Sequence, residues 1–119
     1  MGLSKLLMLS AAICLNQAWV NAGEQLVKVR VGSHSLFAPA DLLIYVTVEK
    51  NSENRLLRVS AESDEFFRSS EVQLEGEESA RIVILHFRDM PSGSYDVKAD
   101  VVGSNGRRRG AARCPVTVL

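Results

Sequence analysis

The part of the sequence that most constrains the fold is a turn followed directly by an alternating run, residues 90–101. Pro91 fixes φ near the value that a tight turn needs, and Gly93 can adopt the positive φ that many turns require. Apolar and charged side chains then alternate with the period of a strand that has one buried face. The apolar face holds Tyr95, Val97, Ala99 and Val101. The sequence therefore predicts a half-buried strand that is entered through a tight turn.

The rest of the chain shows further short strands separated by turn residues. Alternating or β-branched runs occupy residues 26–31, 42–49, 55–61, 66–74, 80–88 and 113–119. Residues 32–41 are expected to cross between strands, because Pro39 cannot donate to a ladder, and Asn105-Gly106 predicts a hairpin. Residues 66–74 are polar enough for an edge strand, whereas residues 80–88 are apolar on both faces. About seven short strands predict an all-β fold, an antiparallel Greek-key β-sandwich of the immunoglobulin-like type.

The first 22 residues have the layout of a signal peptide. Lys5 precedes an apolar run at residues 6–15, and Val20 with Ala22 supplies small side chains for cleavage after Ala22. The apolar run has about ten residues, whereas a membrane-spanning helix needs about twenty. We therefore expect residues 1–22 to be removed after export to the periplasm or the extracellular space.

The predicted domain, residues 23–119, has a nearly even charge balance. Lys5 is the only charged residue in the signal peptide, so 14 basic and 14 acidic residues become 13 and 14, a formal charge of −1. That balance argues against a nucleic-acid partner. No second apolar segment is long enough to span a membrane, and Cys114 is the only cysteine left. Acylation of Cys14 is an alternative to its removal, and Ile13 disfavours it because a small residue is preferred before an acylated cysteine.

Residues 87–97, Phe-Arg-Asp-Met-Pro-Ser-Gly-Ser-Tyr-Asp-Val, resemble the corner between strands E and F of fibronectin type III domains and related bacterial immunoglobulin-like domains. The resemblance implies a tyrosine corner, in which a buried tyrosine hydroxyl bonds upstream main chain. Tyr95 would then bond a main-chain group near Met90, with Met90 packed beneath the turn formed by Pro91 and Gly93. The same residues are also similar to the closing strands of transthyretin-like, carboxypeptidase-regulatory modules, so both kinds of sandwich stay possible here.

Three shorter strings, at residues 38–41, 53–55 and 67–70, resemble segments of small exported bacterial proteins. This resemblance extends over nearly the whole predicted domain and implies no particular activity. An antibody-type domain is not expected, since the characteristic cysteine pair is missing and the one tryptophan, Trp19, lies in the signal peptide.

Residues that could support catalysis or bind a metal are few. A blue-copper site would need a histidine and a methionine soon after Cys114, and the residues that follow Cys114 include neither. We interpret Cys114 as an inert buried thiol, and His34 and His86 as structural residues. The acidic loops at residues 62–65 and 75–78 lack the alternating spacing of a calcium loop. We therefore predict no catalytic residue, no metal site and no cofactor.

Two features point to contact surfaces instead. Arg107, Arg108 and Arg109 form, with Arg113, the only basic cluster, and the predicted hairpin would present it to an anionic surface or an acidic protein loop. Phe37, Phe66 and Phe67 could also form a protein interface if they are exposed. Phe66 and Phe67 cannot both point inward from one strand, so one of them should be exposed, and we select Phe66 as a contact residue.

These observations predict a noncatalytic extracytoplasmic module that binds another protein or assists one. The alternative is a glycan-binding or transthyretin-like accessory module. A glycan-binding face normally presents a row of exposed aromatic rings, and Tyr45 is the only plausible surface tyrosine of the predicted domain. A secreted hydrolase would need a pocket that brings His34 or His86 beside two carboxylates.

Overall fold

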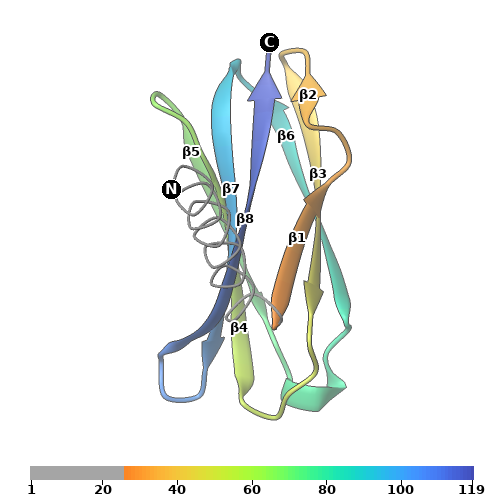
Figure 1. Cartoon of the computed structure of the whole chain (residues 1–119), viewed down its shortest axis with the longest axis vertical. Coiled ribbons are helices and arrows are strands. Elements are labelled where there is room, and N and C mark those ends of the chain that lie inside the picture. Colours follow the sequence, from red (N-terminus) through yellow and green to blue (C-terminus); the bar gives the residue numbers. More distant parts are fainter. Residues whose placement is uncertain (1–25) are drawn as a thin grey trace, which may run out of the picture.

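Two β-sheets pack face to face in the computed structural model, which describes residues 26–119 (Figure 1). The smaller sheet has the order β1–β3–β6, with β1 at Val27–Val31, β3 at Ala40–Val48 and β6 at Ile82–Met90. The larger sheet has the order β2–β8–β7–β4–β5, with strands at Ser35–Leu36, Arg108–Val118, Gly93–Gly103, Asn54–Glu62 and Phe67–Gln73, respectively. A short 3₁₀ helix, η1 at Gly76–Glu78, lies between β5 and β6. The prediction of an all-β antiparallel sandwich is confirmed.

The core lies between the sheets and uses alternate residues of each strand. In β7, Tyr95, Val97, Ala99 and Val101 are all buried, as their alternation predicts. Val97 lies opposite Ala61 of β4 and Cys114 of β8 in the ladder. The predicted strand over residues 95–101 is therefore a central strand of the larger sheet. Because burial of apolar area is the main favourable term in folding, these alternating faces determine which side of each strand points inward.

Several strand boundaries differ from the predicted ones. The crossing segment, residues 32–41, contains β2, which pairs in parallel with the end of β8. β8 starts at Arg108 rather than near residue 113, because the ladder with β7 continues to the hairpin. β5 is the edge strand that its polar sequence predicts. The predicted signal peptide, residues 1–22, and Cys14 lie outside the described residues.

A tyrosine at the start of β7 fixes the connection from β6. The Tyr95 hydroxyl donates a hydrogen bond to the carbonyl oxygen of Pro91, with an O–O distance of 2.7 Å, and Met90 is fully buried beside the turn. Phe87 and Met90 are three positions apart in β6, so in a regular strand they would point to opposite faces. Both point inward because β6 contains a β-bulge between them. Asp89 adopts a φ of 56°, and the register with β3 shifts between Ala40 and Leu42.

The β7–β8 hairpin forms as predicted, although Asn105 and Gly106 do not occupy the two central positions of its turn. The amide of Gly106 donates to the carbonyl of Gly103 at 3.0 Å, so Ser104 and Asn105 are central and Gly106 follows with a φ of 78°. The register shifts between Val101 and Val102. Ser104, Asn105 and Gly106 thus form a three-residue loop, in which a turn is followed by a glycine in the left-handed region. Such loops are a common alternative to two-residue hairpin loops.

Candidate interaction surfaces

The predicted basic cluster is divided between two places on the larger sheet. Arg107, Arg108 and Arg109 lie exposed at the β7–β8 hairpin, and Arg108 Nη1 lies 3.6 Å from Asp100 Oδ1. Arg113 lies farther along β8 and pairs with Asp96 of β7. The hydrogen bond from Arg113 to Asp96, and then the Asp96 charge, raise the pKa of the guanidinium. The sequence placed Arg113 in the cluster because it could not show that Asp96 lies on the neighbouring strand, diagonal to Arg113.

The outward face of the larger sheet carries charges that pair both across strands and along one strand. Arg58 Nε lies 3.0 Å from Glu71 Oε2 across the β4–β5 ladder. Lys98 Nζ lies 3.9 Å from Asp96 Oδ2, and Asp96 also binds Arg113. These groups are largely solvated, so each pair contributes little to stability. This face is therefore charged and exposed to solvent.

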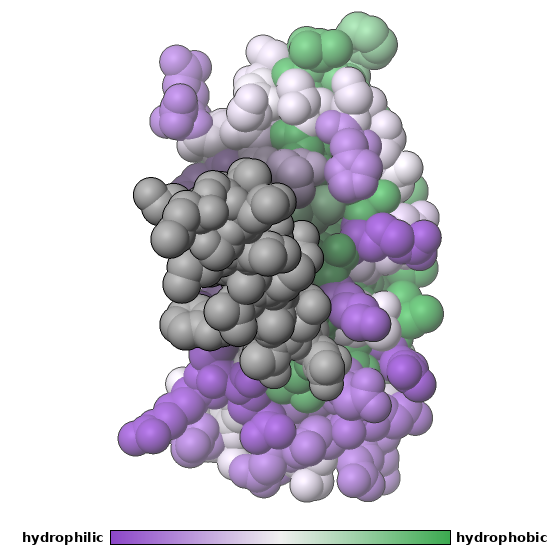
Figure 2. Space-filling model, viewed as in Figure 1, coloured by the Kyte–Doolittle hydropathy of each residue, from purple (hydrophilic) through white to green (hydrophobic). Residues whose placement is uncertain are grey.

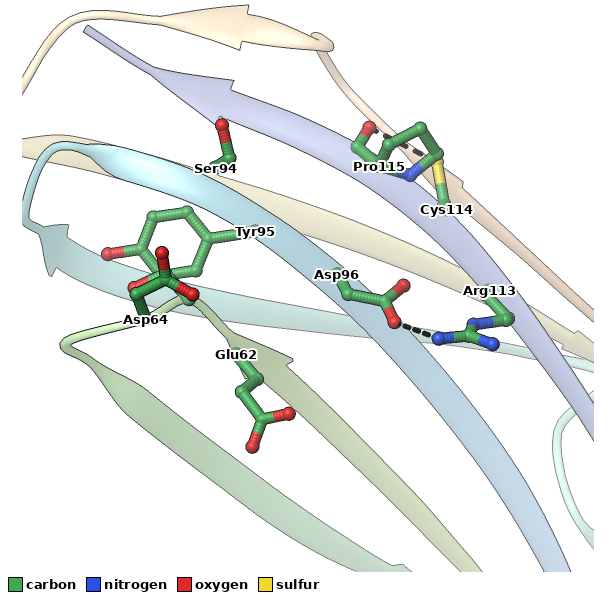
Figure 3. A pocket seen from close by; sticks show the side chains of 9 residues that line it. Glu62, Asp64, Ser94, Tyr95, Asp96, Arg113, Cys114 and Pro115 are labelled. Atoms are coloured by element: carbon green, nitrogen blue, oxygen red, sulfur yellow. Dashed lines mark hydrogen bonds and ion pairs between the residues drawn. The ribbon is translucent and has the colours of Figure 1, made fainter.

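A shallow hollow on this sheet holds carboxylates, Arg113 and Cys114 (Figure 3). Asp96 and Arg113 meet there on neighbouring strands, while Glu62 points away from them. Burial is the main reason that the pKa of the Cys114 thiol is raised, which favours the protonated form over the nucleophilic thiolate. The hollow thus combines an ion pair with a thiol whose protonated form is favoured by burial.

The two histidines lie far apart in the fold: His34 is in the connection before β2, beside β8, and His86 is in β6 of the smaller sheet. His34 Nδ1 lies 3.8 Å from the Cys114 sulfur and 3.1 Å from the carbonyl oxygen of Pro115. His86 Nε2 lies 3.8 Å from Asp41 Oδ2 on the smaller sheet. Among residues 26–119, no group of three or more His, Cys, Asp or Glu side chains is placed to hold a metal ion. The pairing of His34 with Cys114 is a contact that sequence reasoning missed, since 80 positions separate the two residues.

The two phenylalanines at the start of β5 differ in exposure. Phe66 is partly buried against the core, and its ring packs edge-on to Tyr95 with a centroid distance of 6.3 Å. Phe67 is 59% exposed. One of the pair is therefore exposed, as the sequence predicts, and the residue available for contact is Phe67 rather than the selected Phe66.

Three exposed apolar residues lie at the end of the sandwich opposite the arginine hairpin, near the two opposite edges of the larger sheet. Phe37, before β3, is 79% exposed, and Leu119 lies beside it because its carbonyl oxygen accepts the Ala38 amide at 2.9 Å. Phe67 is the first residue of β5, directly after the β4–β5 connection, which lies at the same end in Figure 1. Figure 2 shows hydrophobic residues near β2 and the C-terminus, and hydrophilic residues at the opposite end. We call Phe37, Phe67 and Leu119 the apolar end.

The outward face of the smaller sheet is also apolar. Ile82 and Ile84 of β6 are 55% and 60% exposed, and Leu43 of β3 is exposed next to them. Tyr45 lies opposite Ile84, and the Arg30 guanidinium lies 4.9 Å from the centroid of the Tyr45 ring. Because Arg30 covers this ring, the face does not present the row of free aromatic rings that sugar stacking uses.

Solved structures share this fold at low sequence identity. A fibronectin(III)-like module of Clostridium thermocellum CbhA matches with a TM-score of 0.50 and 23% identity, covering 76% of this chain and 94% of that chain. A superoxide reductase (neelaredoxin) from Ignicoccus hospitalis matches with a TM-score of 0.54 and 12% identity, covering 78% of this chain and 80% of that one. No protein-family model and no curated protein matches the sequence. The likenesses establish an immunoglobulin-like β-sandwich and leave activity open.

Of the described part of the chain, no helix is long and apolar enough to cross a membrane. An immunoglobulin-like sandwich hosts many unrelated functions. The specific function must therefore be argued from the surfaces.

Proposed function

We propose that the protein is an exported, noncatalytic module that binds another protein through the apolar end. The observation that supports this proposal is the exposure of Phe37, in the β2–β3 connection, and of Phe67, at the start of β5, at one end of the sandwich. Aromatic residues contribute strongly to binding when a partner buries them, and loops carried by a rigid scaffold commonly form binding sites. The fibronectin(III)-like fold is compatible with such an accessory role.

Export is part of the proposal, and it rests on the signal-peptide pattern of residues 1–22. Expression of the whole chain followed by N-terminal sequencing of the exported form tests it. A new N-terminus at Gly23 is expected. Recovery of the intact chain from the cytoplasmic fraction would contradict the export proposal without affecting the proposed binding surface.

The arginine hairpin provides a second candidate surface, for an anionic partner. Arg107 and Arg109 are exposed at its tip, and the ion pairs within the described residues involve only Arg108 of these three. Glu53 nevertheless lies close, since its Oε1 accepts a hydrogen bond from the Ser104 hydroxyl at 2.8 Å. This neighbouring carboxylate reduces the local positive potential, so we rank the apolar end first.

Affinity capture from the extracytoplasmic fraction with two variants separates these surfaces. One variant carries Phe37→Ser with Phe67→Ser, and the other carries serine at Arg107, Arg108 and Arg109. All five positions are exposed, so both variants should fold. Selective loss of captured proteins with the phenylalanine variant is expected. Loss with the arginine variant alone would transfer the contact to the hairpin, and unchanged capture with both would exclude both surfaces.

A further inference from the structure

The strand β6 has the sequence of a central strand although it lies at the edge of its sheet. It pairs with β3 on one side, and the order β1–β3–β6 places no strand of residues 26–119 on the other. Natural edge strands are commonly protected by lysine, proline or a polar sequence, and β5 at the edge of the larger sheet follows that rule. In contrast, Ile82 to Phe87 reads Ile-Val-Ile-Leu-His-Phe, which is apolar on both faces. The composition of β6 thus fits a strand with neighbours on both sides.

The hydrogen bonds of β6 show which main-chain groups are free. The amide of Val48 donates to the carbonyl of Arg81 at 2.8 Å, so in an antiparallel ladder Val83 and Leu85 also bond β3. The main-chain groups of the intervening residues, Ile82, Ile84, His86 and Arg88, therefore point away from β3. Arg68 Nη1 donates to the Arg88 carbonyl at 2.5 Å. The free edge is consequently the stretch from Ile82 to His86, with Ile84 at its midpoint.

We propose that this edge pairs antiparallel with the same edge of a second copy of the chain, with Ile84 opposite Ile84 of the second copy. Ile82 then lies opposite His86 of the second copy, and each such pair exchanges two main-chain hydrogen bonds. Three strands from each copy form one continuous sheet. This surface differs from the apolar end, so the inference is independent of the proposed binding function.

The charges near β6 are compatible with this two-fold register. Arg81 lies opposite Phe87 of the second copy, and Arg88 lies opposite Ala80, so no cation faces another cation across the ladder. The outward side chain of Ile84 meets its own equivalent at the axis, with Tyr45 of each copy adjacent to it. A two-fold axis makes each contact occur twice, which is the usual geometry of a homodimer. The second copy therefore supplies both the missing hydrogen bonds and apolar cover.

Introducing a charge at the two-fold axis tests the register directly. The protein is purified from cells that express the whole chain. Sedimentation velocity should show a monomer–dimer equilibrium at protein concentrations from about 1 µM to about 1 mM. Ile84→Lys and Ile84→Glu should each be monomeric, because like charges then face each other at the axis. An equimolar mixture of the two variants should restore the dimer. Wild-type protein that stays monomeric throughout this range would overturn the proposal, as would a wild-type dimer that neither variant weakens or that the mixture does not restore.

A proline pair tests the strand edge itself. Ile84→Pro removes an amide that points away from β3, so the β3–β6 ladder is retained and the dimer should be lost. Ser69→Pro is the matched control. The Leu74 amide donates to the Arg55 carbonyl, and only every second residue of β5 bonds β4 in an antiparallel ladder. The amide of Ser69, five positions before Leu74, therefore points away from β4. The control should dimerise as the wild type does. Equal dimerisation of the two proline variants, with both folded by circular dichroism, would show that β6 main chain is not the contact.

Discussion

The Tyr95 hydroxyl provides the sharpest test of how the two sheets are connected. It donates to the Pro91 carbonyl at 2.7 Å, and the ring is almost fully buried. Tyr95→Phe keeps the ring and its edge-on contact with Phe66 and removes only the hydrogen bond. A typical intramolecular hydrogen bond contributes about 0.5–1.5 kcal/mol net, and leaving a buried acceptor unpaired costs about 1–3 kcal/mol. Pro91 is exposed, so water can reach its carbonyl, and we expect a loss of about 1 kcal/mol.

Equilibrium unfolding in urea measures this loss. The midpoint should fall while the m-value stays constant, because Tyr95→Phe does not change the area exposed on unfolding. In a domain of this size, about 1 kcal/mol corresponds to a decrease in Tm of about 4–8 °C. Tyr45→Phe is the matched control, since it removes the same atom from a ring on the outward side of β3. A loss below about 0.3 kcal/mol for Tyr95→Phe, or an equal loss for both variants, would refute the role assigned to the corner.

Three further predictions concern buried or strained positions. Cys114 should react slowly with a disulfide reagent until urea unfolds the chain. Because the pKa of its thiol is raised in the folded state, the free energy of unfolding should fall above about pH 9 in the wild type, and it should fall less in Cys114→Ala. Asn54→Ala should cost about 1–3 kcal/mol in urea unfolding, because it removes the 2.8 Å bond from the buried Asn54 amide to the Glu49 carbonyl, and an unchanged midpoint would contradict this. Asp89 has a φ of 56°, so Asp89→Gly should stabilise the domain slightly and Asp89→Val should destabilise it by about 1–2 kcal/mol in thermal unfolding. Equal Tm values for the two variants would rule out backbone strain at this bulge.

The sequence predicted the elements whose hydrophobic period is regular. In β7 the alternation from Tyr95 to Val101 identified both the strand and its buried face, because one side of each sheet must face the core. The polar composition of residues 66–74 likewise identified an edge strand. The β2 segment was missed because two residues carry no period, and its pairing depends on the end of β8, far away in the sequence.

The contact residues were harder to predict for a related reason. Adjacent residues such as Phe66 and Phe67 have opposite orientations in a strand, and a short run does not reveal which one faces the core. The ladder decides this, because it places Phe67 opposite Glu62 on the outward face. Arg113 was separated from the arginine hairpin by the same kind of cross-strand relation, its pairing with Asp96.

The turn and alternating run at residues 90–101 determined by themselves that this chain forms a half-buried strand entered through a tight corner. Local dihedral preferences and the period of two suffice for that conclusion. Only the tertiary structure decided that β6 is an edge strand with free main-chain groups, and that the exposed phenylalanines lie at the end opposite the arginines. Both properties depend on which strands are neighbours, and strand neighbours are set by packing between residues distant in the sequence.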